Sequence, residues 1–359
     1  MKIVTIVGAR PQFIKAAAVS RALRQRFREV LVHTGQHYDG NMSQVFFEEL
    51  GIPPPECNLG IGSGEHGAQT GAILAAVEQV LLQEKPDRVL VYGDTNSTLA
   101  GALAAAKLHV PVAHVEAGLR SFNRRMPEEI NRVLTDHVAD LLFCPSQTAV
   151  DHLAAEGIRA GVHRVGDVMY EALLNAVRLA EQRSNALERL GVAPGAYALA
   201  TIHRAENTDD PARLGRLVAA LQEVARTLPV VFPVHPRTRR RLPELAPGRG
   251  LHLVEPVGYL DMARLENGAA LILTDSGGIQ KEAYWLRVPC VTLREETEWV
   301  ETVQQGWNVL AGADPERIVR CARTARRPAA TADAYEGAGS VQRLVAVLEQ
   351  ASRMPEASA

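Results

Sequence analysis

The chain has 359 residues, 47% hydrophobic and 22% charged, which is enough apolar material for two globular domains. Its formal net charge of -2 gives no overall basic field for nucleic acid, and no run approaches the roughly 18 apolar residues of a membrane span. The four cysteines lie far apart without CxxC spacing, so no zinc or redox motif is indicated and a reducing, cytoplasmic compartment is expected.

Short apolar runs alternate with helical patterns in the first half of the chain. The expected strands are Lys2–Val7, Val30–His33, Val89–Tyr92, Val112–Val115 and Leu141–Cys144. Helices fit between them, and the clearest is the alanine-rich stretch Ser97–Leu108. This alternation predicts βαβ units, hence an α/β fold with a parallel sheet and helices on both faces.

The same alternation restarts after a long helical stretch at about Val168–Leu190, which ends at Gly191. The expected strands of this second series are Tyr197–Ile202, Val230–Val234, Leu251–Val254, Leu271–Thr274 and Cys290–Leu293. We therefore predict two doubly wound, Rossmann-like lobes, residues 1–168 and 169–359, and leave open whether the last helix packs back on the first lobe. Ligands of such folds bind at the carboxyl ends of the strands, so a cleft between the lobes is the expected binding site.

Two glycine-bearing turns, one in each half, follow a predicted strand and open a helix. In Gly8-Ala9-Arg10-Pro11 the turn is expected to leave backbone N–H groups unpaired, and Arg10 and Lys15 add positive charge. In Ser276-Gly277-Gly278 the glycines let an anion approach the backbone closely, and Glu282 follows one helical turn later. Each turn alone also fits an ordinary surface turn, whereas the two together favour a bound diphosphate.

Carboxylates stand at the ends of neighbouring predicted strands in the first half. Asp94 ends one strand and Glu116 the next, while Glu128 and Glu129 open a helix after Pro127. Like charges held close raise the pKa of one carboxyl group, which suits general acid–base chemistry. Asp94 also fits a helix cap, and Glu128 or Glu129 a helix-dipole partner, but Glu116 has no such structural role.

A histidine and an arginine, His203 and Arg204, end the first strand of the second series. This pair suits the binding of a diphosphate at a strand end. His235 and Arg237 form a second, weaker pair at the end of the next strand.

Read together, six motifs occur in one order from Met1 to about residue 345. They are Gly8-Ala9-Arg10-Pro11 with Lys15, Gly93-Asp94-Thr95, His114-Val115-Glu116-Ala117-Gly118-Leu119-Arg120, Pro127-Glu128-Glu129 with Asn131-Arg132, His203-Arg204, and Thr274-Asp275-Ser276-Gly277-Gly278-Ile279-Gln280. Any one is weak, but in this order they resemble the non-hydrolysing UDP-N-acetylglucosamine 2-epimerases.

The resemblance implies a GT-B fold and the interconversion of UDP-N-acetylglucosamine and UDP-N-acetylmannosamine, with no cofactor and no catalytic metal. UDP would be eliminated to leave a 2-acetamidoglucal and then added back. The carbon–hydrogen bond at C2 has no adjacent carbonyl, so breaking the bond from C1 to oxygen first is what makes that proton acidic. A homodimer is the default assembly.

The resemblance also implies roles for individual residues. The acid–base and catalytic set is Asp94, Glu116, Glu128 and His203. The substrate-binding set is Arg10, Lys15, Arg204, Ser276, Gly277, Gly278 and Glu282, with Glu282 on the ribose and the others on the diphosphate. Which carboxylate takes the C2 proton stays open.

The sequence departs from the family pattern in two places. Trp299 and Val300 stand where an arginine and a proline are usual, and this form resembles the branch acting on UDP-2,3-diacetamido-2,3-dideoxyglucuronate, for which Arg124 would supply a cation. Asp39 and Ala68 stand where a glutamine and an arginine are usual in the loops that bind a second, activating substrate molecule. Losing that arginine removes a phosphate partner, so we do not expect activation in the usual form.

Three other interpretations remain. A GT-B glycosyltransferase would share the nucleotide site but needs an acceptor site, often an apolar membrane-facing patch, and no basic amphipathic stretch is evident. A hydrolysing relative would share the elimination step and release UDP. A nucleotide-sugar sensor would bind without turnover.

Overall fold

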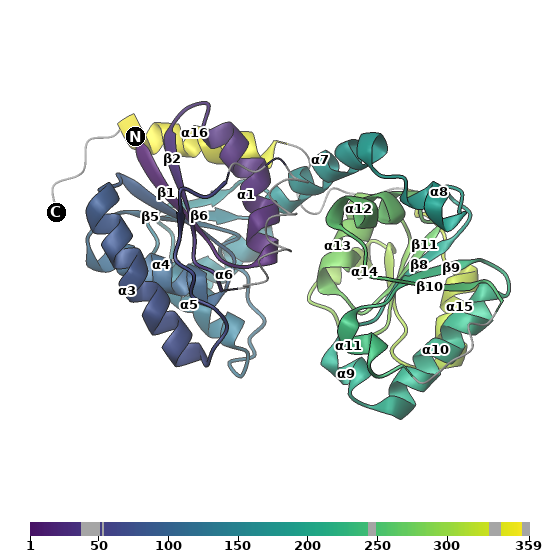
Figure 1. Cartoon of the computed structure of the whole chain (residues 1–359). Helices are drawn as coiled ribbons and strands as arrows, with labels where there is room; N and C mark the ends of the chain where they lie inside the picture. The colour runs from purple at the N-terminus through teal and green to yellow at the C-terminus, as the bar shows by residue number, and fades with distance from the viewer. Residues whose placement is uncertain (37–50, 52–53, 243–248, 330–338, 354–359) are drawn as a thin grey trace. The chain divides into compact units, whose positions relative to one another are not determined.

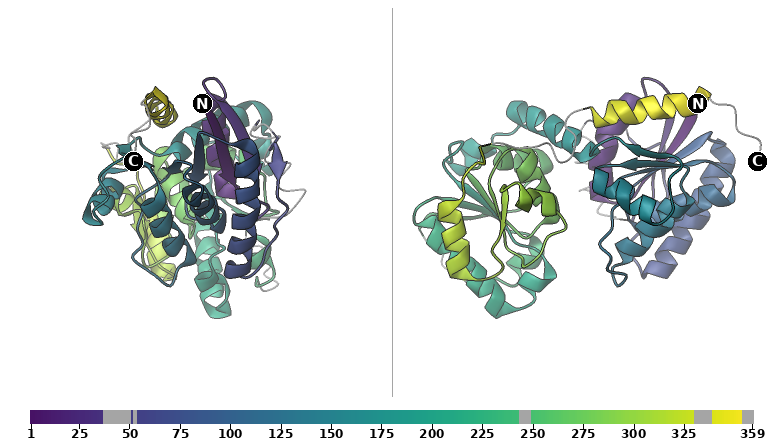
Figure 2. Two further views of the ribbon diagram at one scale, coloured as in Figure 1. Left: turned by 90° about the vertical axis from the view of Figure 1, so that its left-hand side faces the viewer. Right: turned by 180° about the vertical axis from the view of Figure 1, so that it is seen from behind.

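The computed structural model describes residues 1–36, 51, 54–242, 249–329 and 339–353. The chain forms two compact units, Met1–Ala172 with Asp333–Ala359, and Leu173–Ala332 (Figure 1). The sequence placed the boundary after residue 168 and the C-terminal stretch in the second lobe. In the structure the C-terminal helix α16 (Ser340–Arg353) lies in the first unit, where it packs against α1 (Arg10–Leu23) (Figure 2).

The first unit has a parallel sheet of seven strands among its described residues, in the order β3-β2-β1-β4-β5-β6-β7. The strands are β1 (Lys2–Val7), β2 (Arg28–His33), β3 (Cys57–Asn58), β4 (Arg88–Tyr92), β5 (Val112–Val115), β6 (Leu141–Cys144) and β7 (Val162–Arg164). The order reverses between β1 and β4, which is the switch point at which doubly wound sheets bind ligands. Thr5 of β1 is in register with Leu31 of β2 and Leu90 of β4.

Small residues let the helices of the first unit approach the sheet closely. The remaining helices there are α3 (His66–Glu84), α4 (Asn96–Lys107), α5 (Pro127–Val138) and α6 (Gln147–Ala155), and α7 (Val168–Arg183) leads into the second unit. Helix α4 packs between α3 and α5. A side chain at Gly101 would meet Ile6 of β1 at 2.7 Å, so the alanine- and glycine-rich sequence of α4 is a packing requirement.

The second unit repeats the arrangement with six strands in the order β10-β9-β8-β11-β12-β13. The strands are β8 (Ala198–Thr201), β9 (Val230–Pro233), β10 (Leu251–Val254), β11 (Leu271–Thr274), β12 (Cys290–Thr292) and β13 (Asn308–Leu310). The helices are α8 (Ala186–Leu190), α9 (Ala205–Thr208), α10 (Pro211–Ala225), α11 (Pro236–Arg239), α12 (Tyr259–Gly268), α13 (Gly277–Trp285), α14 (Val300–Gln304) and α15 (Pro315–Thr324). Its switch point lies between β8 and β11.

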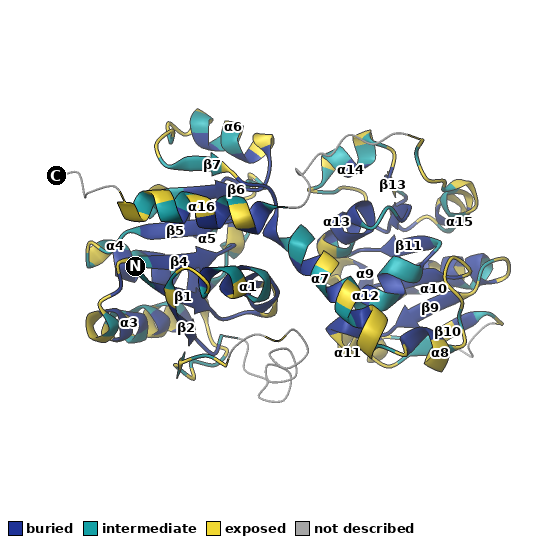
Figure 3. Ribbon diagram, turned by 90° about the horizontal axis from the view of Figure 1, so that it is seen from above, coloured by how far each residue is buried: buried dark blue, intermediate teal, exposed yellow. Residues whose placement is uncertain are grey.

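Each face of the second sheet has its own apolar core, and the inner strands β8, β9, β11 and β12 are buried throughout (Figure 3). Ala198 and Ala200 pack on the side of α10 and α15, while Tyr197 and Leu199 pack with residues of α8 and α12. This alternation along one strand explains why the sequence shows continuous apolar runs. No helix in the described part of the chain combines the length and the apolar character needed to cross a membrane.

Candidate active site

The turn after β1 is shaped by hydrogen bonds inside the first unit. A side chain at Gly8 would collide with the hydroxyls of Ser97 and Thr34. The N–H groups of Gly8 and Ala9 donate to Oε1 of Gln12 at 2.8 and 3.0 Å. The expectation of unpaired N–H groups in this turn is therefore wrong, because the side chain of Gln12 folds back onto them.

A buried ion pair joins α1 to the end of β5. Nζ of Lys15 contacts Oε2 of Glu116, and their side chains are only 7% and 15% exposed. Burial alone would lower the pKa of Lys15, but Glu116, with Asp167 and Asp94 nearby, outweighs burial and raises that pKa. Lys15, which the resemblance placed on the diphosphate, is held on a carboxylate, whereas Arg10 is exposed at the start of α1.

Glu116 itself has an unusual backbone conformation, with φ of +74°. The N–H groups of Glu116 and Ala117 both donate to the carbonyl of Phe143 in β6 at 3.1 Å, which holds this turn in place. Gly93 also has a positive φ, of +63°, and a Cβ there would lie 3.2 Å from Oε2 of Glu116. A side chain in this region costs about 1–3 kcal/mol, so the conformation persists because the surrounding structure imposes it. Such strain often marks a functional residue.

Helix α5 supports the turn that carries Asp94. Arg132 contacts the Asp94 carboxylate, and Nδ2 of Asn131 donates to the Asp94 carbonyl at 2.9 Å. Burial would lower the pKa of Arg132, but Asp94 and Glu129 outweigh it and raise that pKa. These contacts explain why the Asn131-Arg132 pair accompanies the acidic motif in the sequence.

The two adjacent glutamates of α5 have different environments. Glu129 is buried and accepts hydrogen bonds from the N–H groups of Ser121 and Phe122, both at 2.9 Å. Burial would raise the pKa of Glu129, but these hydrogen bonds and Arg132 outweigh it and lower that pKa. Glu128 is exposed, and no hydrogen bond to its side chain is seen within the described residues. Glu129 therefore anchors a loop, and Glu128 is the one available to a ligand.

In the second unit, a buried carboxylate organises the end of β8. Asp275 accepts hydrogen bonds from the backbone N–H groups of His203 and Arg204, both at 3.0 Å, and from Nδ2 of Asn207 at 3.1 Å. Burial lowers the pKa of His203 and outweighs the opposite effect of Asp275, while Arg204, His235 and Arg237 lower it further. Sequence reasoning assigned no role to Asp275, although its place directly after β11 was a usable signal.

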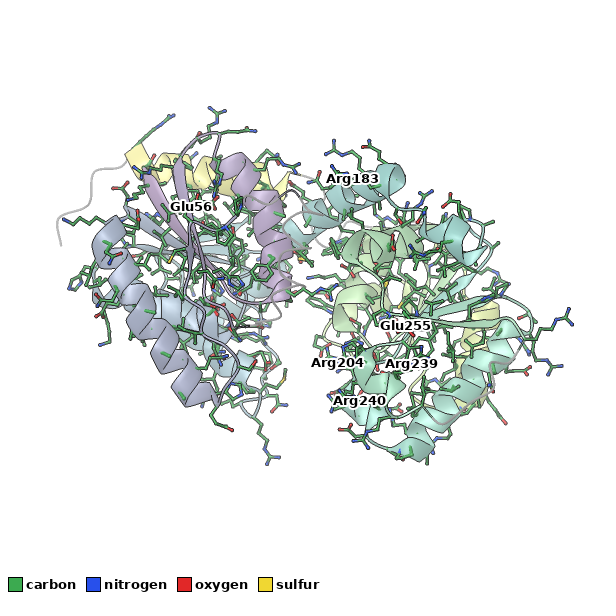
Figure 4. The ribbon with its side chains drawn as sticks, in the orientation of Figure 1. Glu56, Arg183, Arg204, Arg239, Arg240 and Glu255 are labelled. Carbon is green, nitrogen blue, oxygen red and sulfur yellow. The ribbon has the colours of Figure 1, made fainter. Side chains whose placement is uncertain are left out.

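The weaker histidine pair predicted from sequence lies beside the stronger one. The rings of His203 and His235 are 5.8 Å apart. Arg237 pairs with Asp209 at 3.1 Å. Arg239 contacts Glu255, and both of these side chains are labelled in Figure 4. Carboxylates thus offset much of the positive charge on α11.

The start of α13 has the features of an anion-binding site. The hydroxyl of Ser276 caps the helix by accepting from the N–H of Ile279 at 3.4 Å. A Cβ at Gly277 would lie 3.7 Å from Nη2 of Arg204, so the guanidinium converges on the positive end of this helix. Gly278 continues the first turn.

Two carboxyl groups lie near each other on α12 and α13. Glu282 is 9% exposed and Glu266 is 2% exposed. Burial, and secondarily Glu282, raises the pKa of Glu266 well above its ordinary value. Sequence reasoning missed Glu266, because its proximity to Glu282 depends on how α12 packs against α13.

The departure at Trp299 has a local explanation. Nζ of Lys281 lies 4.0 Å from the centre of the Trp299 ring, which is cation–π geometry. Arg294, itself 7% exposed, pairs with Glu298 at 3.1 Å. An arginine at position 299 would set a second cation against Lys281, whereas the indole attracts it.

The loops linked to activation are described in part. Oε1 of Gln36 accepts from Oγ of Ser97 at 2.6 Å, and Oε1 of Gln69 accepts from Nδ2 of Asn96 at 2.8 Å. Ala68 is exposed, and Asp39 lies outside the described residues. No group of three or more potential ligands that could hold a metal ion is found among the residues that the structure describes.

Fold and site together define a class: a protein of two Rossmann-like units, with carboxylates at the strand ends of one and a serine-capped, glycine-rich helix start in the other. Residues 21–349 match the protein family described as UDP-N-acetylglucosamine 2-epimerase. The chain belongs to this family, whose members are isomerases, and the expected family and enzyme class are confirmed.

Several relatives are similar over nearly their whole length. A UDP-N-acetylglucosamine 2-epimerase homolog of Methanococcus maripaludis is 58% identical, covering 89% of this chain and 91% of that protein. The UDP-2,3-diacetamido-2,3-dideoxy-D-glucuronate 2-epimerase of Pseudomonas aeruginosa is 56% identical, with 90% and 92% covered.

Among solved structures, the Methanocaldococcus jannaschii UDP-GlcNAc 2-epimerase in complex with UDP-GlcNAc and UDP superposes with a TM-score of 0.83 at 44% identity, covering 98% of this chain and all of that one. The predicted GT-B type α/β fold is confirmed.

Proposed function

We propose that this protein interconverts UDP-N-acetylglucosamine and UDP-N-acetylmannosamine without hydrolysis, through a 2-acetamidoglucal. The observation that carries the proposal is the strained, partly buried Glu116, paired with Lys15 beside the turn of Asp94. The relative from Methanocaldococcus jannaschii, whose structure contains UDP-GlcNAc and UDP, supports this choice of substrate.

The reaction needs acid–base groups on two faces of the sugar. In the first step the bond between C1 and the phosphate oxygen breaks, its electron pair leaves with UDP, and a carboxylate takes the C2 proton, giving a double bond between C1 and C2. In the second step a carboxylic acid returns a proton to the other face of C2, and the UDP oxygen adds to C1. We assign these transfers to Asp94, Glu116 and Glu128, since Glu129 is fixed in its loop.

The second unit holds the nucleotide in this proposal. Arg204 and the start of α13 at Ser276, Gly277 and Gly278 bind the diphosphate, which becomes more negative as the bond to C1 breaks. His203 is neutral at neutral pH, because burial lowers its pKa, and it binds the diphosphate as a hydrogen-bonding group. Glu282 accepts hydrogen bonds from the ribose hydroxyls.

Proton NMR in D₂O tests this function directly. The purified protein is incubated with UDP-N-acetylglucosamine, and the C2 proton and the attached UDP are followed. Loss of the C2 signal, with the manno epimer appearing as its UDP derivative, is the expected result. Free N-acetylmannosamine with UDP would indicate the hydrolysing relative, and no exchange at all would favour a glycosyltransferase or a sensor.

A second candidate substrate is UDP-2,3-diacetamido-2,3-dideoxyglucuronate, converted by the same chemistry. It is favoured by the Pseudomonas aeruginosa relative at 56% identity. Arg124 is exposed four residues before Glu128, and a cation there suits the extra carboxylate. A second tube with this sugar, run at the same enzyme concentration, decides which substrate has the higher kcat/KM.

We also propose a homodimer that forms through the outer face of α3, α4 and α5. Large apolar side chains are exposed there: Leu82 is 50%, Ile130 47% and Leu134 48% exposed. On α3 the exposed positions 67, 68, 71, 72 and 75 are all glycine or alanine. A stable interface buries about 800 Å² per partner, which three helices can supply. Sedimentation equilibrium of the wild type and of Leu134→Glu is expected to show a dimer and a monomer, respectively.

A cytoplasmic location is part of the proposal. All four cysteines are unpaired, which suits a compartment that keeps thiols reduced. No nucleic-acid or membrane partner is proposed, because the cations of α11 already pair with Asp209 and Glu255. Cell fractionation with an antibody against the protein checks the location.

A further inference from the structure

A chain of buried polar groups runs beneath the turns that carry Asp94 and Glu116. Nε2 of His114, in β5, lies 2.7 Å from the carbonyl oxygen of Gly93, directly before Asp94. Nδ1 of the same ring lies 2.7 Å from Oδ1 of Asp136 in α5. The side chains of His114 and Asp136 are fully buried.

Both ring nitrogens of His114 have partners that belong to this unit. The carbonyl of Gly93 can only accept, so Nε2 donates. Asp136 accepts from the N–H of Gly118 at 3.1 Å and from Nη1 of Arg120 at 2.7 Å. Burial would raise the pKa of Asp136, but His114 and Arg120 outweigh burial and lower that pKa. Asp136 therefore joins His114, Gly118 and Arg120 in one buried cluster.

At its other end, the hydrogen-bond network is linked through Arg120 to the C-terminal end of α6. Arg120 donates from Nη1 to the carbonyl of Leu119 at 2.7 Å and from Nε and Nη2 to Glu156 at 2.7 and 2.8 Å. The Arg120 side chain is only 1% exposed. The network thus starts at the turn before Asp94, passes through α5, and ends on the loop that follows Glu116.

We propose that His114 is a positioning residue that, with Asp136 and Arg120, holds the Asp94 and Glu116 turns in the one arrangement that serves catalysis. This inference rests on the acid–base role proposed for those carboxylates. Gly93, Glu116 and Gly118 all have positive φ, which glycine adopts without strain but which the surrounding structure must impose on Glu116. His114 bonds directly to the first of these residues, and Asp136 to the last.

The choice of polar groups argues for positioning over simple stability. Well-packed apolar residues often replace a buried ion pair without loss of stability, so stability alone gives no reason for the buried pair of Arg120 and Asp136. A fully satisfied network does fix directions, because each hydrogen bond sets an angle as well as a distance. In this unit the network fixes the orientation of the two turns that carry Asp94 and Glu116.

Two replacements separate the two interactions of His114, the bond to Gly93 and the contact with Asp136. In His114→Gln the amide nitrogen reaches the position of Nε2 and keeps the donor to Gly93. In His114→Asn it reaches the position of Nδ1, keeps the contact with Asp136 and loses the donor to Gly93. Since a misplacement of about 1 Å can cost on the order of 100-fold in rate, His114→Asn is expected to lower kcat about 100-fold with KM within threefold, and His114→Gln less than tenfold.

His137→Asn is the matched control. His137 lies on the same helix as Asp136 and is 47% exposed. Within the described residues its ring bonds to the carbonyl of Val133 and, more distantly, contacts Glu156. This variant is expected to keep the wild-type kcat and KM. Its thermal midpoint also provides the reference for a conservative histidine change in this unit.

The decisive readout does not depend on activity. Hydrogen exchange, followed by mass spectrometry on the full chain, is expected to quicken at residues 93–97 in His114→Asn, which loses the bond to Gly93, and at residues 116–120 in His114→Gln, which loses the contact with Asp136. Unchanged exchange at residues 93–97 in His114→Asn would overturn the proposal, whatever its kcat. If that variant does not fold, Asp136→Asn decides by the same exchange measurement. If the wild type fails to epimerise either sugar, the proposed function fails, while the exchange result still judges the positioning role.

Discussion

Lys15 and Glu116 are 101 residues apart in the sequence, yet the ammonium of one contacts the carboxylate of the other inside the first unit. The contact forms because α1 starts at the switch point beside β4, and the turn after β5 brings Glu116 to the same edge of the sheet. A Cβ added at Gly93 would lie 3.2 Å from Oε2 of Glu116 and 3.4 Å from Nζ of Lys15, so the glycine leaves room for both side chains. Within the first unit, Lys15 therefore binds the carboxylate of Glu116.

Replacing Lys15 by methionine is expected to lower kcat about 100-fold, because Glu116 loses the cation that holds it in place. Breaking a buried ion pair costs about 3 kcal/mol or more, so the free energy of unfolding is expected to fall by that order. Urea unfolding of Lys15→Met, Glu116→Gln and the double variant measures the coupling. Strictly additive losses would show that the two side chains do not stabilise each other.

Glu128 and Glu129 provide a pair of adjacent, chemically identical residues for comparison. Glu128→Gln is expected to reduce turnover by at least 100-fold while leaving the thermal midpoint near that of the wild type, as an exposed acid–base group should. Glu129→Gln is expected to destabilise the protein by about 1–3 kcal/mol, because it weakens the hydrogen bonds from Ser121 and Phe122. Steady-state rates and thermal unfolding, measured on both variants, would contradict this assignment if the two effects were exchanged.

Trp299→Arg is expected to destabilise the second unit. The change removes a cation–π contact with Lys281 that contributes about 1 kcal/mol, and it adds a like charge in its place. Trp299→Phe keeps an aromatic face and should retain most of the stability. Urea unfolding of both variants checks the order; equal stability of the arginine and phenylalanine variants would contradict the role given to the ring.

Much of the fold was predictable because its signals are local. Alternating apolar runs gave ten strands of the two sheets, and the turn glycines marked where helices begin. The strands Cys57–Asn58, Val162–Arg164 and Asn308–Leu310 were missed, since they are two or three residues long and lie at sheet edges. So short a run gives no periodicity to read.

The site was predictable in position but not in its pairings. Strand ends pointed to Asp94, Glu116 and His203, whereas the burial of Glu129 depends on a loop folding back onto it. The place of Asp275 under His203 follows from the pairing of β8 with β11, which no local pattern contains. Long-range contacts of this kind decide which of two neighbouring residues is structural and which faces a ligand.

His203 gives the protein a pH dependence whose sign follows from its surroundings. Burial lowers its pKa in the folded state below the ordinary value of about 6.5, so the unfolded chain binds more protons in the interval between the two values. The free energy of unfolding therefore falls as the pH drops below about 6.5, and His203 causes no such loss above that pH. Urea unfolding between pH 5 and 8 of the wild type and of His203→Gln is expected to show a smaller loss at low pH in the variant. An unchanged dependence of stability on pH in the variant would mean that His203 is not the group that sets it. UDP binding to the same variant, measured by calorimetry at neutral pH, is expected to weaken, because the neutral wild-type ring serves there as a hydrogen-bonding group. Unchanged affinity would remove His203 from the diphosphate site.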